Sequence, residues 1–106
     1  MKKYRQLNFH KKEKIQESTK KIIFDLFENN PELKRYTNFD LRESIARRCT
    51  EVLAFGYQEN ISNWESNIER SIICIFPSYI PIKIQEEIKN KIIVGILEEK
   101  ELQFIK

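Results

Sequence analysis

Residues 84–96 read IQEEIKNKIIVGI, with an isoleucine at every fourth position from Ile84 to Ile96. A repeat of four places these side chains along one side of an α-helix, because the helix has about 3.6 residues per turn. The pattern predicts a helix over residues 81–101. Pro81 suits its first turn, where the missing N–H group of proline costs no hydrogen bond.

The same periodicity predicts three more helices, over residues 12–29, 40–55 and 63–76. Pro31 and Pro77 end the first and third of them, because the residue before a proline is pushed out of the helical region. The three expected apolar faces comprise Ile15, Thr19, Ile22, Ile23, Leu26 and Phe27; Leu41, Ile45, Cys49, Val52 and Phe55; and Trp64, Ile68, Ile72, Ile75 and Phe76.

Local signals place the helix ends. Asp40 with Glu43, and Ser62 with Glu65, have the spacing of N-terminal capping boxes. Gly56 stands where a left-handed residue would close the second helix. The connection from residue 31 to 39 is long enough to hold a turn of its own.

The fold class that follows is all-α, either a four-helix bundle or an irregular four-helix array. The chain has 106 residues, with two glycines and three prolines, so it lacks the frequent turns that many short strands require. We expect one helical domain over residues 12–106, preceded by a basic N-terminal arm over residues 1–11. An alternative reads the isoleucine-rich residues 72–84 as a strand, although a single strand would have no partner.

Most catalytic and metal-binding motifs are absent from the sequence. Two glycines cannot form a glycine-rich phosphate loop, and His10 is the only histidine. We therefore predict no enzymatic activity, no metal site and no cofactor. Paired carboxylates such as Glu65 and Glu69 could serve acid–base chemistry if they were buried together, which keeps an enzyme as a third alternative.

Cysteine usage and hydropathy bear on location. Cys49 and Cys74 lie within helical patterns and are expected to be buried thiols in a reducing, cytoplasmic environment. No stretch has the pattern of a signal peptide, and the longest apolar run, residues 72–84, contains two prolines and cannot span a bilayer. We expect no membrane contact.

Charge is distributed unevenly. Residues 1–21 contain eight basic and two acidic side chains, whereas the whole chain has a net charge of +3. A basic segment with interleaved aromatic residues suits phosphate neutralisation and base stacking, although such a segment can also be merely solubilising. The predicted nucleic-acid contacts are Lys2, Lys3, Arg5, Lys11, Lys12 and Lys14, with Tyr4 and Phe9 as stacking groups. Lys34–Arg35 and Arg47–Arg48 would extend this basic patch if the chain folds back.

The fourth predicted helix has more apolar surface than one face needs. Ile82, Ile93 and Leu97 widen its isoleucine stripe, Gly95 beside the stripe would allow close helix approach, and Phe24 lies off the face of the first helix. These four large side chains are predicted to contact a protein partner or a second copy of the chain. The alternative is a central helix packed by the other three and covered by residues 102–105.

Two charged residues fall on predicted apolar faces. Arg48 lies between Val52 and Phe55 on the helical wheel, and Glu65 lies between Ile72 and Phe76. Because a half-buried charge normally needs a partner, we predict an Arg48–Glu65 ion pair across the hairpin of the second and third helices. Alternatively, Arg48 reaches water and Glu65 closes its capping box.

The sequence therefore predicts a non-catalytic helical binding protein. It would act as an accessory subunit, regulator or inhibitor of a nucleic-acid-associated complex, using the basic arm and the apolar surface of the fourth helix. The alternative is a pure protein–protein interaction module of the immunity or inhibitor type.

Overall fold

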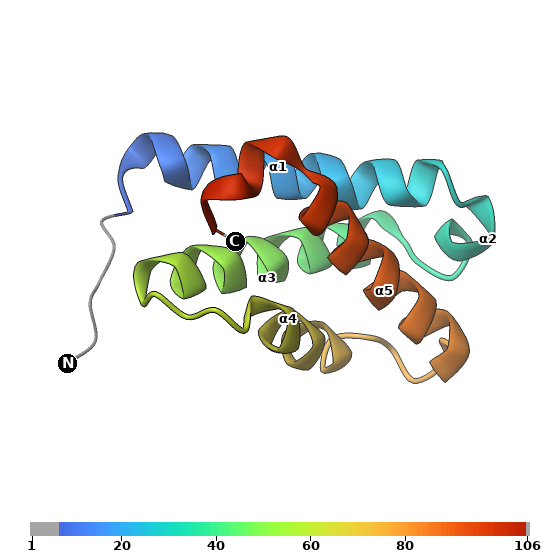
Figure 1. Ribbon diagram of the computed structural model, residues 1–106. Coiled ribbons are helices and arrows are strands. Elements are labelled where there is room, and N and C mark those ends of the chain that lie inside the picture. Colours follow the sequence, from blue (N-terminus) through green and yellow to red (C-terminus); the bar gives the residue numbers. More distant parts are fainter. Residues whose placement is uncertain (1–6, 106) are drawn as a thin grey trace.

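The structure, a computed structural model, describes residues 7–105, and every regular element in that range is a helix (Figure 1). Four long helices form the molecule: α1 (Phe9–Glu28), α3 (Phe39–Gln58), α4 (Trp64–Ile73) and α5 (Ile82–Glu98). The short helix α2 (Pro31–Lys34) joins α1 to α3, and the 3₁₀ helix η1 (Lys100–Ile105) follows α5. The predicted all-α class is confirmed, and the strand reading of residues 72–84 is wrong, because this stretch comprises the end of α4, a turn and the start of α5.

The helices form an irregular array rather than a bundle of parallel axes. Figure 1 shows α1 and α3 side by side, α5 crossing them diagonally, and α4 below α3 and seen nearly end-on. Helix α1 packs against α3, α5 and η1, while α4 packs against α3 and α5. Helix α1 is thus the element that touches most of the others.

Asparagine side chains cap the N-termini of the two longest helices, α1 and α3. Helix α1 starts about one turn earlier than predicted. Asn8 Oδ1 accepts from the Lys11 amide at 2.8 Å, and Asn38 Oδ1 accepts from the Leu41 amide at 2.8 Å. The Asp40 capping box is therefore wrong, because Asn38 already satisfies a free amide at that end. The Ser62 box is also wrong, since Asn63 is the N-cap of α4 and makes no side-chain cap bond.

The left-handed residue that closes α3 is Asn60, two residues after the helix, rather than Gly56. Asn60 has the left-handed φ of 57°, the Ile61 amide donates to the Gly56 carbonyl at 2.8 Å, and the Asn60 amide donates to the Tyr57 carbonyl at 3.2 Å. These two bonds form a Schellman motif, and asparagine tolerates the left-handed region better than most residues. The prediction for Gly56 was wrong because the helix continues through it to Gln58.

The chain leaves the α-helical path again at Glu99, which adopts an extended conformation after α5. Helix α5 therefore ends at Glu98, and the chain continues as η1. The 3₁₀ segment packs against α1, α3 and α5 and buries Leu102 and Ile105. The tail thus covers part of the core, as the central-helix alternative expects.

The core is one cluster that all the elements share. The predicted stripe of α5 is confirmed, because Ile88, Ile92 and Ile96 are fully buried and Ile84 packs against them. Phe55 was wrongly assigned to the core face of α3: it is 57% exposed, whereas Leu53 and Tyr57 are buried. The buried cluster comprises Ile15, Ile23, Leu26, Phe27, Leu33, Ile45, Ala46, Cys49, Leu53, Tyr57, Trp64, Ile68, Ile72, Ile88, Ile92, Ile96, Leu102 and Ile105.

Thr19 is the polar residue inside this core, as its place on the α1 apolar face predicts. Its hydroxyl is fully buried and has no hydrogen-bond partner. Leaving a buried polar group unpaired is costly. Thr19→Val keeps the shape and removes that group, so we expect it to raise the unfolding free energy by about 1 kcal/mol in urea denaturation.

Thr50→Val is the matched control for this prediction. The Thr50 hydroxyl donates to the Ala46 carbonyl at 2.8 Å, so its removal deletes a hydrogen bond that exists. We expect no gain from this variant. Equal effects of the two substitutions would contradict the assignment of an unsatisfied hydroxyl at Thr19.

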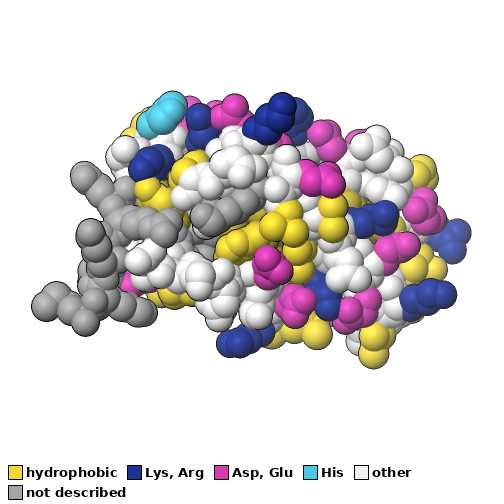
Figure 2. Space-filling view, viewed as in Figure 1, with side chains coloured by type: hydrophobic (Ala, Val, Ile, Leu, Met, Phe, Trp, Pro, Cys, Tyr) yellow, Lys and Arg dark blue, Asp and Glu magenta, His cyan; other side chains and the backbone are white. Residues whose placement is uncertain are grey.

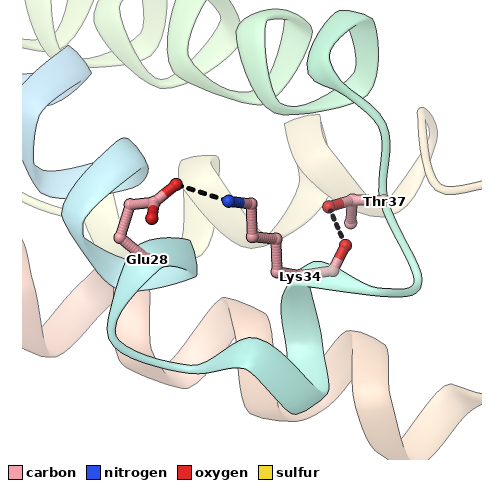
Figure 3. Close-up of polar contacts among 3 residues, drawn as sticks. All are labelled: Glu28, Lys34 and Thr37. Carbon is pink, nitrogen blue, oxygen red and sulfur yellow. Dashed lines mark hydrogen bonds and ion pairs between the residues drawn. The ribbon is translucent and has the colours of Figure 1, made fainter.

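A polar clamp holds α2 against the end of α1 (Figure 3). Lys34 Nζ donates to Glu28 Oε1 at 2.6 Å, and the Thr37 hydroxyl donates to the Lys34 carbonyl at 2.9 Å. The hydrogen bond from Lys34 lowers the pKa of Glu28 below its ordinary value. Helix α2 confirms the predicted turn within residues 31–39, and Figure 1 shows α2 at the end of the molecule away from the start of α1.

None of the helices within residues 7–105 combines the length and the apolar content that a bilayer crossing requires.

Candidate functional site

A groove of about 620 Å³ runs between α1 and α3. Side chains of α1 form one wall and side chains of α3 form the other. Two of the lining residues of α3 are less exposed: Ala46 is buried and Thr50 is half-buried. Its volume falls within the range of roughly 300 to 1,000 Å³ that ligand sites occupy. The lining residues are Lys12, Gln16, Lys20, Glu43, Ala46, Arg47, Thr50 and Glu51.

The position of this groove follows from the helical register of α1. Lys12, Gln16 and Lys20 are spaced four residues apart and form one row along the helix. Lys14 contacts Glu101 of η1, and Ile22 lies against Gly95 of α5, so those two residues face the other flank of α1. The groove therefore opens on the side of the α1–α3 pair that α5 and η1 leave uncovered.

Basic side chains outnumber acidic ones around the groove. An adjoining hollow of about 390 Å³ shares Arg47 and Glu51 with it and adds Arg48. Four basic side chains (Lys12, Lys20, Arg47 and Arg48) and two carboxylates (Glu43 and Glu51) leave a charge of +2 over the two hollows. None of the four cations makes an ion pair with another residue in the range 7–105. Their charge is thus available to an anionic ligand.

The opposite flank of α1 carries the opposite charge. A second cleft of about 620 Å³ lies between α1 and α5, and its apolar lining includes Ile22 and Val94. Its charged lining consists of Asp25, Glu87, Glu98 and Lys91, three carboxylates and one ammonium group. The face that bears α5 mixes both signs of charge with exposed apolar side chains (Figure 2). A polyanion would therefore be drawn to the α1–α3 groove rather than to this cleft.

Two of the lysines that were predicted to contact phosphate interact instead with other residues of the protein. Lys11 Nζ donates to the Tyr57 hydroxyl at 2.5 Å and lies 5.0 Å from the centre of that ring and 5.9 Å from the Phe104 ring. Lys14 Nζ pairs with Glu101 Oε2 at 2.8 Å, and this hydrogen bond lowers the pKa of Glu101. Neither lysine therefore belongs to the candidate site.

The remaining predicted contacts divide into two groups. Lys12 and Phe9 are exposed, Phe9 to 81%, and both belong to the first turn of α1 rather than to an arm. Lys2, Lys3, Tyr4 and Arg5 lie outside the described residues. The sequence prediction missed Lys20 and Gln16, although their spacing from Lys12 is a signal that would have found them.

The two basic pairs that were expected to extend the patch, Lys34–Arg35 and Arg47–Arg48, have different positions in the fold. Arg47 joins Lys12 and Lys20 in the groove, as chain reversal between α1 and α3 allows. Lys34 is paired with Glu28, and Arg35 donates to the Tyr36 hydroxyl at 3.3 Å, so neither extends the patch.

The Arg48–Glu65 ion pair was predicted on the premise that both charges are half-buried, and this premise is wrong. Both side chains are exposed, so neither charge needs an internal partner. Among the described residues the ion pairs join Lys14 to Glu101, Lys34 to Glu28, and Lys89 to both Glu69 and Glu86. The structure shows no Arg48–Glu65 pair.

The predicted partner-binding residues do not form one continuous stripe. Ile82 is 75% exposed and Leu97 is also exposed, but Ile93 is half-buried against the core. Phe24 is half-buried against the core. Its ring lies 5.8 Å from the ring of Phe39 at the start of α3, so its aromatic contact is with α3. Glu86 stands between Ile82 and Ile93 and pairs with Lys89.

The two cysteines are free thiols in different surroundings. Burial raises the pKa of the Cys49 thiol to about 12, so this group stays protonated at neutral pH. Cys74 is exposed at the end of α4, which corrects its predicted burial. Within the described part of the chain, no three histidine, cysteine, aspartate or glutamate side chains are grouped so that they could hold a metal ion.

Comparison of the chain with protein-family models, with curated proteins and with solved structures finds no match.

Proposed function

We propose that this protein is a non-catalytic nucleic-acid-binding protein that acts as an accessory subunit, regulator or inhibitor in a nucleic-acid-associated complex. The observation that carries the proposal is the basic row of the α1–α3 groove, formed by Lys12, Lys20 and Arg47. We also propose a cytoplasmic location, which the free thiols Cys49 and Cys74 support.

The charge pattern of the groove suits a polymer rather than a single small anion. Lys12 and Lys20 are separated by eight residues, or about 12 Å along the helix axis. A nucleic-acid strand carries one phosphate per roughly 3.4 Å of axial length in its helical form, so one strand can contact both lysines and Arg47 at once. Each contact releases a counterion, which makes the binding strongly salt-dependent.

The two carboxylates of the groove moderate this attraction. Glu43 and Glu51 lie one turn before and one turn after Arg47 on α3. A phosphate that approaches Arg47 meets their negative charge as well, so affinity stays moderate. Glu51→Gln removes one repulsive charge and should strengthen binding.

The test is the affinity of the full chain for a fluorescent oligonucleotide, measured by anisotropy between about 50 and 200 mM salt. The variant Lys12→Ala/Lys20→Ala/Arg47→Ala removes three phosphate contacts. We expect its affinity at low salt to fall at least about ten-fold, and the slope of log K against log salt to decrease by about 2.

The matched control is Lys83→Ala/Lys91→Ala/Lys100→Ala, which removes the same charge from three exposed positions of α5 and η1. We expect a much smaller loss of affinity from this control. Equal losses in the two triple variants would show that net charge acts and the groove does not. A chain that binds no oligonucleotide at low salt would refute the proposal.

A protein–protein interaction module is the second candidate, supported by the exposed apolar side chains of α5, with Ile82 exposed to 75% and Val94 to 49%. A second copy of the chain is the simplest partner. A concentration-dependent mass above that of the monomer in sedimentation equilibrium, lost in Ile82→Asp, would favour this candidate, above all if the oligonucleotide does not bind.

A further inference from the structure

We propose that the nucleic acid taken up by the α1–α3 groove is single-stranded, with bases stacked on Phe55 and Phe9. This inference rests on the proposed function and adds the class of polymer. It starts from two phenylalanines that the fold leaves in solvent, Phe9 exposed to 81% and Phe55 to 57%.

Phe55 follows two residues that line the groove on α3. Arg47, Glu51 and Phe55 are spaced four residues apart and form one row of neighbouring side chains on α3, which turns gradually around the helix axis. Arg47 and Glu51 line the groove, and Phe55 lies one turn beyond them. A base that leaves the groove at this end meets the ring of Phe55.

Phe9 stands at the corresponding end of the other wall. It is the first residue of α1, one turn before Lys12. The contact of Lys11 with Tyr57 places the start of α1 beside the end of α3, and Figure 1 shows these two ends together. One exposed phenylalanine therefore lies one turn beyond the lining residues of each helix, at the same end of the basic row.

An aromatic ring beside a row of cations selects for unpaired bases. Every base presents a flat face on which a phenylalanine ring can stack, whereas the bases of a duplex are already stacked on one another. A duplex would contact the cations through its phosphates and leave both rings in water. The rings thus add affinity for a single strand alone.

The dimensions of the row indicate a short binding site. Phe9 and Lys20 are eleven residues apart, or roughly 16 Å along the axis of α1. At about 3.4 Å of axial length per nucleotide, this distance corresponds to roughly five nucleotides. A site of this size lies at the short end of the range that single-strand-binding folds cover.

The experiment compares a fluorescent oligo-dT strand with its duplex with oligo-dA, using the full chain at low salt. We expect the single strand to bind more tightly than the duplex. Phe55→Ala should lower single-strand affinity at least about five-fold and leave duplex affinity unchanged. Phe39→Ala is the matched control, because Phe39 is also 57% exposed but lies at the start of α3, several turns from Phe55.

Phe55→Trp provides a second, spectroscopic test. It keeps an aromatic ring at this position, so single-strand affinity should be retained. Stacking should quench the added tryptophan fluorescence with the single strand and leave it unchanged with the duplex, once the signal of buried Trp64 in the wild-type chain is subtracted.

The outcomes separate this inference from the proposed function. Equal affinity for duplex and single strand, with Phe55→Ala behaving like Phe39→Ala, would overturn the single-strand inference. The proposed function would then still stand if binding depends on Lys12, Lys20 and Arg47. Failure of both polymers to bind would overturn the two together.

Discussion

Phe27→Ala is expected to lower the unfolding free energy by about 3 to 5 kcal/mol and the Tm by at least about 12 °C. Phe27 is 1% exposed and belongs to the shared core on α1, the helix that touches most of the others. Removing its ring forfeits the burial of a large apolar surface and leaves a cavity that a close-packed interior fills only in part. Urea and thermal denaturation, followed by circular dichroism, measure the loss.

The same substitution at Phe55 is the control. Like Phe27, Phe55 lies in the last turn of a 20-residue helix, but it is 57% exposed, so its truncation leaves no cavity. We expect Phe55→Ala to cost less than about 1 kcal/mol. If the two variants lost equal stability, the assignment of Phe27 to the core and Phe55 to the surface would be wrong.

Gly95→Ala is expected to destabilise the fold by about 1 to 3 kcal/mol, although alanine is the better helix former. A Cβ atom on Gly95 would lie 2.7 Å from Cγ2 of Ile22, much closer than two carbon atoms can approach. Isoleucine is branched at Cβ and cannot swing this methyl group aside freely. Helices α1 and α5 must therefore separate or Ile22 must leave its rotamer, and the cost exceeds the gain of about 1 kcal/mol in helix propensity.

Two further variants test this explanation. Gly56→Ala is the control, because its Cβ would lie at an ordinary 3.9 Å from the Ile61 carbonyl oxygen, and we expect it to be neutral or stabilising. Ile22→Ala removes the clashing methyl group, so Gly95→Ala should cost less in the Ile22→Ala background than in the wild-type chain. Additive effects of the two substitutions would rule out a direct steric contact.

The helix termini show how far local patterns reach. Each of the four long helices was predicted within three residues of its observed start, because apolar periodicity extends over several turns. The residues that begin and end them were mostly misassigned. Asn8, Asn38 and Asn60 act at these positions, whereas Asp40 and Gly56 were expected there. Several neighbouring residues could cap the same helix end. Which of them does so depends on where tertiary packing makes the chain leave the helix.

The candidate site was only partly predictable. The excess of basic residues near the start of the chain predicted a basic site there, and Lys12 and Phe9 of α1 are exposed in that region. Which lysines remain available depends on contacts distant in sequence, since Lys11 meets Tyr57 and Lys14 meets Glu101. The same holds for Arg47, which reaches the groove because α3 runs back along α1.

By itself the sequence determined the class of the fold, the number of long helices, the isoleucine stripe of α5 and the role of Gly95 in close packing. Each of these depends on residue types repeated at helical spacing, which is a local property. Only the tertiary structure decided that Phe55 faces water, that Arg48 and Glu65 are exposed and form no ion pair, and that Lys12, Lys20 and Arg47 share one groove. Those features depend on which flank of each helix its neighbours cover, and periodicity along a single helix does not contain that information.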